Sequence, residues 1–318
     1  MRSMILIWLS CVALMQAAVT LQPVEQIVVE GSAKDMVVEN AILYIGTDKG
    51  KMQSYDLKQQ KFIGAVKFPD IKDFMGDTIP TRVSSLDAMD GRLVMLTDSG
   101  IGGYANIWLY ENNQSRLLIT HKDKRAIVKV RFVDRTHLLF GYLSNEAALF
   151  DIQTKKERYR VQLTESKFSD FALNNDRSKA AFGCESGVIT VIDTRTGKTI
   201  KELQGINKDN TYKVDFKNGT VSAAGQDRIG AVYDLAGGKG EGIKAGFLIY
   251  ATGLSPSAKR VAFAIDEEND IAVYKRSTLS KQYLLRGQKS TLNSILFINE
   301  DTIVSASDDN TVMLWKLK

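Results

Sequence analysis

Short apolar runs alternate with polar turns along almost the whole chain. Residues 41–46, 92–96 and 260–265 are runs of this kind, and each is followed by turn-forming residues. Gly, Asn, Asp and Ser fill the intervening positions, and these residues tolerate the backbone conformations that tight hairpins require. Such runs predict β-strands, and no stretch follows the 3.6-residue period of a long amphipathic helix. The pattern therefore predicts an all-β protein.

One structural unit recurs at a nearly constant period. We place the end of its third predicted strand at an aromatic or aliphatic residue followed by a polar one, at positions 56, 111, 151, 193, 234, 275 and 316. The steps between these ends are 55, 40, 42, 41, 41 and 41 residues. A period near 41 residues with four short strands in each unit is typical of the blades of a β-propeller. The repeat predicts seven four-stranded blades.

The last unit carries the most complete motif. A strand of small residues at 302–307 leads into a polar turn at 308–310, and the next strand ends on Trp315. This segment resembles the end of a WD40 repeat, so the chain resembles the seven-bladed WD40 propellers. The resemblance implies that turn aspartates, here Asp227 and Asp309, belong to internal hydrogen-bond networks that stiffen their blades. It also implies a structural role for Trp315.

The seventh unit lacks a fourth strand after Trp315, since only three residues follow it. Residues 24–29 have the pattern of a strand and precede the first complete unit. A ring of blades is stabilised when its two chain ends share one blade, because no sheet edge is then left open at the seam. We therefore expect the N-terminal strand to complete the last blade.

The first 18 residues differ from the repeats. Arg2 precedes an uncharged apolar run at 4–15, and small residues follow it. This arrangement is typical of a secretory signal peptide. We expect residues 1–18 to be removed, residues 19–318 to form the propeller, and the mature protein to be periplasmic. The apolar run is short for a membrane-spanning helix and no other segment approaches its length, so we expect no membrane span after signal removal.

Composition argues against several kinds of site. The net charge is only +5, and the short basic clusters at 122–125 and 155–156 fall in predicted turns, which favours solvated surface over a nucleic-acid site. The two histidines, His121 and His137, do not occupy the Gly-His position of a WD40 repeat and cannot supply a metal triad. Removal of the signal leaves Cys184 as the one cysteine, which excludes an intramolecular disulfide. We expect no catalytic residues, no metal and no cofactor.

The 55-residue step contains an insertion around residues 67–82. Long loops that interrupt a regular repeat often carry function. One interpretation is a partner-binding lid, with Phe74 and Met75 as apolar anchors beside Asp73 and Asp77. The other is a surface excursion whose apolar residues fold onto the blade below. The aspartates do not have the spacing of an EF-hand, so the sequence does not favour a Ca²⁺ site.

Propellers act most often through the loops on their faces, so we expect a non-enzymatic protein-interaction scaffold. The chain also resembles the NapL-like WD-repeat accessory proteins that are encoded with periplasmic nitrate reductase in epsilonproteobacteria. The signal peptide, the degenerate sevenfold repeat and segments such as residues 41–50 carry this resemblance. It implies a role in maturation of the reductase or in its electron supply, with reductase components as partners.

Two other functions stay open. An envelope-assembly scaffold would bind extended peptides at an exposed strand edge. A propeller hydrolase or ligand binder would need several convergent carboxylates and a histidine, or Trp-rich repeats. The chain has two histidines and three Trp residues, which disfavours this last class.

Overall fold

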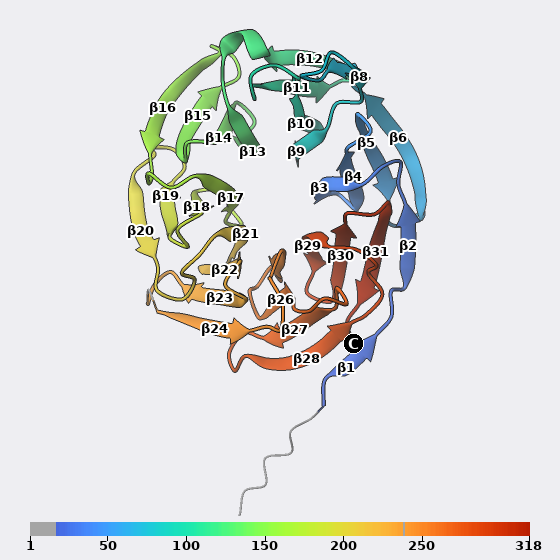
Figure 1. Ribbon diagram of the computed structural model, residues 1–318, viewed down its shortest axis with the longest axis vertical. Coiled ribbons are helices and arrows are strands. Elements are labelled where there is room, and N and C mark those ends of the chain that lie inside the picture. Colours follow the sequence, from blue (N-terminus) through green and yellow to red (C-terminus); the bar gives the residue numbers. More distant parts are fainter. Residues whose placement is uncertain (1–16, 238) are drawn as a thin grey trace, which may run out of the picture.

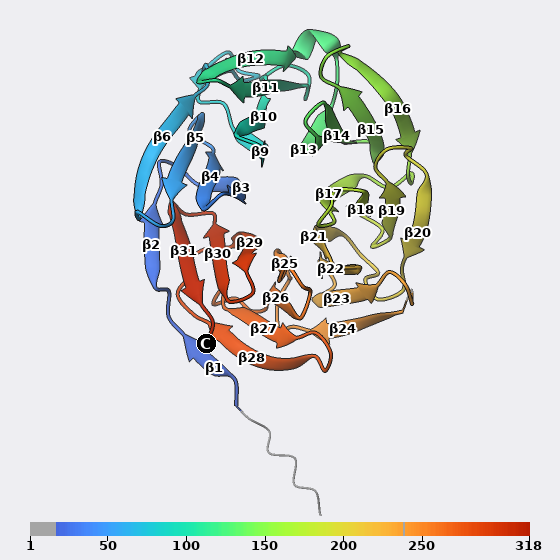
Figure 2. The ribbon, with the colours of Figure 1, turned by 180° about the vertical axis from the view of Figure 1, so that it is seen from behind.

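A computed structural model describes residues 17–237 and 239–318. Seven sheets of the described residues are arranged as a ring around a central axis (Figures 1 and 2), and their strands are antiparallel except for one added at the rim. This arrangement confirms the predicted all-β, seven-bladed propeller. The first 16 residues of the predicted signal peptide lie outside the described residues. No helix of the described chain is both long enough and apolar enough to cross a membrane.

Each of the first four blades contains four strands, which run in order from the central axis to the rim. Blade 1 consists of β3 (Ala33–Glu39), β4 (Ile42–Thr47), β5 (Lys51–Asp56) and β6 (Lys61–Lys67). Blade 2 consists of β9 (Val83–Met89), β10 (Arg92–Asp98), β11 (Ala105–Glu111) and β12 (Gln114–Ile119). Blade 3 consists of β13 (Ile127–Asp134), β14 (His137–Tyr142), β15 (Glu146–Asp151) and β16 (Lys156–Gln162). Blade 4 consists of β17 (Phe168–Leu173), β18 (Lys179–Cys184), β19 (Ile189–Asp193) and β20 (Thr199–Leu203).

The remaining blades follow the same plan, with additions from the N-terminal segment. Blade 5 consists of β21 (Thr211–Lys217), β22 (Thr220–Gly225), β23 (Ile229–Asp234) and β24 (Gly240–Lys244). Blade 6 consists of β25 (Thr252–Leu254), β26 (Arg260–Ala264), β27 (Ile271–Lys275), β28 (Ser280–Leu285) and β1 (Val19–Leu21). Blade 7 consists of β29 (Leu292–Asn299), β30 (Thr302–Ser307), β31 (Thr311–Lys316) and β2 (Glu25–Val28). Outside the blades lie the hairpin strands β7 (Ile71–Lys72) and β8 (Thr78–Ile79) and the 3-10 helix η1 (His121–Asp123).

The third strand of every blade ends at the position that the repeat predicts. These ends are Asp56, Glu111, Asp151, Asp193, Asp234, Lys275 and Lys316. At three of these ends, the aspartate side chain accepts two backbone N–H groups of the turn that follows the strand. Oδ1 of Asp56 accepts hydrogen bonds from the backbone N–H groups of Lys58 and Gln59, at 2.8 and 2.9 Å. Oδ1 of Asp151 and of Asp193 accepts the corresponding pairs in their own turns, so the repeated aspartate is a turn former.

The apolar core is divided among the interfaces between neighbouring blades. Buried side chains of the described chain form seven clusters, and each cluster takes residues from two adjacent blades. Trp315, which is fully buried, belongs to the cluster between blades 6 and 7. Every blade therefore depends on both of its neighbours for burial of its two faces.

The seam of the ring is closed by the N-terminal segment, as predicted. Strand β2 pairs antiparallel with β31, and Ile27 lies opposite Val312. Ile27 and Val29 are buried between blades 7 and 1. The sequence pattern did not predict the second addition, in which β1 runs parallel to β28 and gives blade 6 a fifth strand (Figure 1).

A hairpin at the mouth of the central channel

The insertion at 67–82 forms a hairpin whose turn is held by one carboxylate. Ile71 pairs with Ile79 and Lys72 with Thr78. Oδ1 of Asp73 accepts hydrogen bonds from the backbone N–H groups of Met75 and Asp77, both at 2.9 Å. The backbone N–H of Asp73 donates to the carbonyl oxygen of Asp77 at 3.0 Å. Asp73 therefore shapes the turn, and its hydrogen bonds fix the backbone that carries Phe74 and Met75.

The two apolar residues at the tip of the hairpin project into solvent. Phe74 is 94% exposed and Met75 is 73% exposed. The alternative in which they fold onto the blade below does not occur in this structure. Ile79 of the same hairpin and Ile101 of blade 2 are also exposed, so several large apolar side chains lie on this part of the surface.

The hairpin is fixed to blade 2 through the strand that follows it and through a glycine-rich loop. Thr81 Oγ1 donates to the carbonyl oxygen of Asp98 at 2.8 Å, and Arg82 forms an ion pair with the Asp98 carboxylate at 3.2 Å. Burial raises the pKa of Asp98, and the positive charge of Arg82 only partly offsets this effect. Gly100 lies against the backbone of Lys72, since a Cβ at Gly100 would approach the Lys72 carbonyl oxygen to 2.1 Å.

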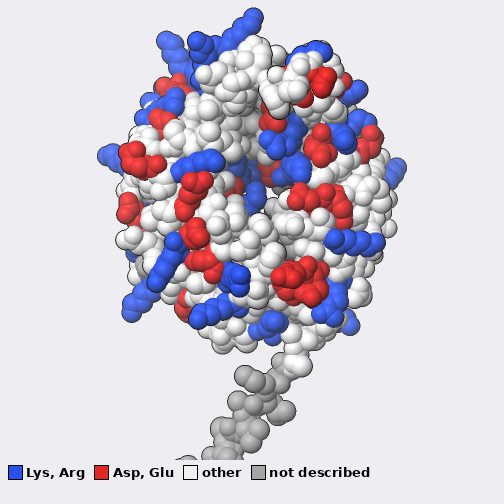
Figure 3. Space-filling model, in the orientation of Figure 1, with Lys and Arg blue, Asp and Glu red and all other residues white. Residues whose placement is uncertain are grey.

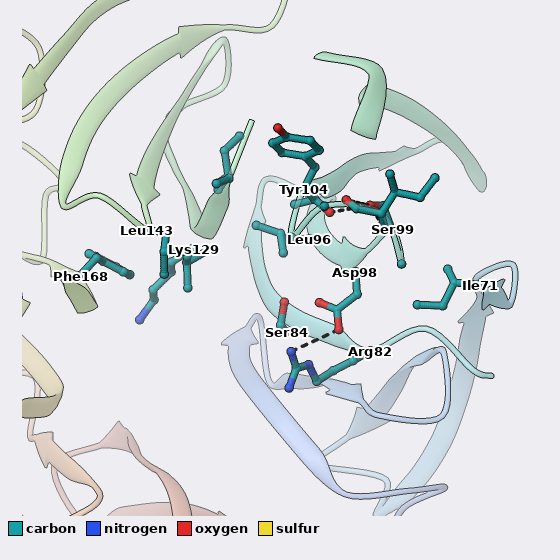
Figure 4. Close-up of a pocket in the computed structure, with 18 of the residues that line it drawn as sticks. Ile71, Arg82, Ser84, Leu96, Asp98, Ser99, Tyr104, Lys129, Leu143 and Phe168 are labelled. Atoms are coloured by element: carbon teal, nitrogen blue, oxygen red, sulfur yellow. Dashed lines mark hydrogen bonds and ion pairs between the residues drawn. The ribbon is translucent and has the colours of Figure 1, made fainter. Parts of the chain in front are cut away.

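Beneath the hairpin, a pocket of about 610 Å³ opens into the central channel. Its upper wall is mainly apolar and comes from the hairpin and blades 2 to 4: Ile71, Ile79, Leu96, Tyr104, Leu143 and Phe168. Figure 4 shows Tyr104, Leu96 and the Arg82–Asp98 ion pair on one side of the cavity, with Lys129, Leu143 and Phe168 on the other. An apolar wall with a few charged groups is typical of a binding cavity.

Charged side chains of the inner strands line the deeper part of the channel. Arg131 contacts both oxygens of Asp35, with its Nη1 at 2.8 Å from Oδ2 and its Nη2 at 3.1 Å from Oδ1. Lys129 contacts the carboxylate of Asp170. Burial would raise the pKa of Asp35, but the charges of Arg131 and Lys129 and the hydrogen bond from Arg131 outweigh it, so the pKa is lowered. Burial also lowers the pKa of Lys129 to about 8, although Asp170 opposes the change.

Inner-strand aspartates also connect neighbouring blades, a role that the sequence analysis missed. Each of them accepts a hydrogen bond from a backbone N–H of the next inner strand, in the pairs Asp35 with Leu86, Asp87 with Phe132, Asp170 with Val214, and Asp215 with Leu254. The distances lie between 2.8 and 3.1 Å. The available signal was a lone acidic residue within the first apolar strand of a unit, which is unusual for a strand that faces a core.

Two of the predicted structural residues lie in hydrogen-bond networks inside their blades. Asp227 accepts from Asn207 Nδ2 at 3.1 Å and from the backbone N–H of Lys208 at 2.8 Å. Trp315 Nε1 donates to Ser305 Oγ at 2.8 Å, and Gln288 Nε2 donates to the same oxygen at 2.7 Å.

The third predicted structural residue, Asp309, accepts a hydrogen bond from the backbone N–H of Thr311 at 2.7 Å, within its own turn. Its neighbour Asp308 instead accepts from Lys34 of blade 1 at 3.0 Å and so connects blade 7 to blade 1. No group of three or more His, Cys, Asp or Glu side chains within residues 17–237 and 239–318 is arranged to hold a metal ion.

The ring of seven sheets around a central channel defines a seven-bladed β-propeller fold. No family model and no curated protein matches the chain. A similar solved structure is the β-propeller domain of Cps50 (Swd1) from Myceliophteria thermophila. It is 13% identical, its TM-score is 0.71, and the match covers 93% of this chain and 99% of that chain. At this identity the likeness shows the fold alone.

Proposed function

We propose that this protein is a non-enzymatic scaffold that binds a partner protein through the face carrying the β7–β8 hairpin. The observation that carries the proposal is the exposure of Phe74 and Met75, at 94% and 73%, on a turn whose backbone is held by Asp73. Aromatic residues and methionine are enriched in the buried centres of protein interfaces. A rigid turn also lowers the entropy cost of docking, because the anchors need little further ordering.

The proposal places this scaffold in the periplasm, with components of periplasmic nitrate reductase as its partners. The support is the signal-like segment at residues 1–18 and the resemblance of the degenerate sevenfold repeat to the accessory proteins of that reductase. In this role the propeller holds a reductase component during maturation or electron supply. It contributes a docking surface and no catalytic group.

The test is capture of partners from the periplasm of nitrate-grown cells with tagged mature protein, followed by mass spectrometry. We expect the wild-type protein to retain nitrate reductase subunits. Replacing both Phe74 and Met75 with alanine should weaken binding of the captured subunit about tenfold or more, since interface anchors commonly contribute over 1 kcal/mol each. Binding of the purified subunit, measured by calorimetry, gives the size of the effect.

The matched control replaces Val28 and Ile200 with alanine. These residues are apolar and exposed, at 63% and 45%, and they lie on the rim strands β2 and β20. The control variant should bind like the wild type, and both variants should melt at the wild-type temperature. Equal binding by the Phe74→Ala/Met75→Ala protein would remove the hairpin from the proposal, and failure to retain any reductase subunit would remove the reductase.

One observation favours a second candidate, a scaffold that takes up extended peptides of envelope proteins. The chain itself adds β1 to the outer edge of blade 6, parallel to β28, with Val19, Thr20 and Leu21 opposite Tyr283, Leu284 and Leu285. Strand addition of this kind is a known mode of peptide recognition. The same capture experiment separates the candidates. Retention of outer-membrane or secretion proteins, unaffected by the hairpin substitutions, would favour this second function.

A further inference from the structure

The centre of the channel is formed by four charged side chains from four blades. The pocket of about 610 Å³ and a second cavity of about 350 Å³ share Asp35, Lys129, Asp170 and Lys213 in their walls. We call these four residues the channel ring, since they lie where the two cavities meet. The space-filling view along the axis shows a hollow at the middle of the molecule with basic and acidic side chains around it (Figure 3).

Both carboxylates of the channel ring are already engaged. One oxygen of Asp170 contacts Lys129, and the other accepts the backbone N–H of Val214 at 3.1 Å. Oδ2 of Asp35 accepts the backbone N–H of Leu86 at 2.9 Å, and both Asp35 oxygens contact Arg131. A carboxylate held in this way has little remaining capacity for another cation.

Lys213 is the cation of the ring without an anionic partner. No carboxylate oxygen of residues 17–237 and 239–318 lies within 4.0 Å of its Nζ. In the wall of the second cavity, Lys129, Arg131 and Lys213 supply three positive charges, and Asp35 and Asp170 supply two negative ones. The other charged side chains of that wall form pairs of opposite sign, Arg177 with Asp87 and Lys217 with Asp215. The centre of the channel therefore carries one excess positive charge in a partly enclosed site, where charge is poorly solvated.

The titration of Lys129 is consistent with this excess. Burial, together with the charges of Arg131 and Lys213, lowers the pKa of Lys129 to about 8, and Asp170 acts in the opposite direction. Asp35 raises it slightly. An anion placed beside Lys213 would reduce the repulsion between these cations and would stabilise the protonated form of Lys129.

We propose that the channel ring binds one carboxylate group, with Lys213 as its direct partner. A single negative charge matches the single excess positive charge. Leu143 and Phe168 on the wall above suit the apolar part of the molecule that bears the carboxylate. The carboxylate belongs either to a small organic acid or to an acidic residue or chain end of a polypeptide that enters the channel. The site does not require the hairpin to bind a partner, so it stands apart from the function proposed above.

The test follows each lysine by NMR in full-length mature protein labelled at lysine Cε and Nζ. Acetate is titrated in place of chloride at constant ionic strength, and acetamide serves as the neutral control. We expect acetate to produce saturable shifts at Lys213 and Lys129 with one common binding curve. The pKa of Lys129 should rise toward the ordinary lysine value, and acetamide should produce neither change.

Two variants separate a specific site from a general salt effect. Lys213→Met should abolish the saturable shift at Lys129, whereas Lys281→Met, at an exposed position on the outer strand β28, should leave it unchanged. An acetate effect that does not saturate, that acetamide reproduces, or that survives Lys213→Met would overturn the proposal.

A second arm distinguishes the two sources of the carboxylate. A short peptide ending in leucine is compared with its C-terminal amide. Tighter binding of the free acid than of acetate, with loss of binding by the amide, assigns the site to a polypeptide. Binding of acetate without binding of either peptide assigns it to a small acid. Failure of both probes contradicts the carboxylate site and leaves the hairpin experiment unaffected.

Discussion

At the scale of the residue, aspartate has two distinct roles in this propeller. At the end of a third strand it accepts N–H groups from its own turn, as Asp56, Asp151 and Asp193 do. On an inner strand it accepts an N–H from the next blade, as Asp35 and Asp170 do. The first role is local and the second joins separate sheets. Substitutions at the two kinds of position should therefore differ greatly in their cost.

Asp35→Asn should destabilise the protein by about 3 kcal/mol at pH 7, because it leaves the largely buried guanidinium of Arg131 without its anionic partner. The folded-state pKa of Asp35 is lowered, so its stabilising contribution is complete above the unfolded-state pKa of about 3.9. That contribution is lost as the pH falls through the folded-state pKa. The difference between variant and wild type should shrink below pH 4 in urea denaturation series.

The matched control for this prediction is Asp90→Asn. Asp90 forms an ion pair with Arg135, but both side chains are more than half exposed, and exposed pairs contribute little to stability. We expect its free energy of unfolding to stay close to that of the wild type at every pH. A loss for Asp35→Asn that is small at pH 7, or that persists unchanged under acid, would contradict the assignment of a stabilising buried pair.

At the scale of the element, the hairpin is placed by its contact with the loop at 99–104 between β10 and β11. Three glycines of this loop, Gly100, Gly102 and Gly103, have positive φ angles of 74°, 59° and 70°. Ser99 Oγ donates to the carbonyl oxygen of Tyr104 at 2.6 Å and closes the loop. The loop thus forms a compact support for the hairpin. The hairpin can lie this close to the loop only because Gly100 has no side chain.

Gly100→Ala should displace the hairpin from blade 2. The new Cβ would meet the Lys72 carbonyl oxygen at 2.1 Å, and backbone must shift to relieve that contact. We expect faster trypsin cleavage after Lys72 and weaker capture of the partner. Gly103→Ala is the control, because Gly103 has a similar φ but no neighbour within 4 Å of the added Cβ.

The control should show only the cost of alanine at positive φ, about 1 kcal/mol, without faster cleavage at Lys72. If both glycine variants are cleaved at the same rate, the hairpin is not held by the contact at Gly100. The unchanged blades also provide an internal standard, since cleavage elsewhere in the chain should not differ between the two variants.

At the scale of the whole molecule, stability depends on closure of the ring. Each apolar cluster is shared by two blades, so an open seam would expose two faces at once. At the seam, β2 pairs with β31, and Asn293 Nδ2 of blade 7 donates to the carbonyl oxygen of Ala33 at 3.0 Å. Lys34 and Asp308 add an ion pair across the same junction.

Deletion of residues 21–30 should sharply lower the melting temperature. It removes buried Ile27 and Val29 and unpairs β31, which together amount to about 5 kcal/mol or more. For a chain of this size, that loss corresponds to a fall of about 10 °C or more. Calorimetry of the deleted and complete chains measures the difference.

The rescue experiment joins residues 21–30, through a flexible linker, to the C-terminus of the deleted chain. Strand β2 can then pair with β31 from the other end, and the melting temperature should recover most of its loss. An unchanged melting temperature after deletion, or no recovery in the permuted chain, would show that strand pairing at the seam does not limit stability.

The sequence by itself determined the number of blades, their period and the strand at the seam. Local sequence patterns predict these features: apolar runs, turn residues and an aspartate at the end of a third strand. Each pattern acts on neighbours only a few residues away. The position of the insertion could also be predicted, because it breaks the 41-residue period. Its exposed apolar tip could not, because burial depends on what lies beneath.

Only the tertiary structure decided which charges meet in the channel. Asp35 and Arg131 are 96 residues apart, and closure of the ring around blade 2 brings them into contact. Among the described residues, no carboxylate lies within ion-pair distance of Lys213, and Asp35 and Asp170 in the same cavity walls are held by other groups. The parallel pairing of β1 with β28 was decided in the same way, since a three-residue strand carries too little pattern to specify its partner.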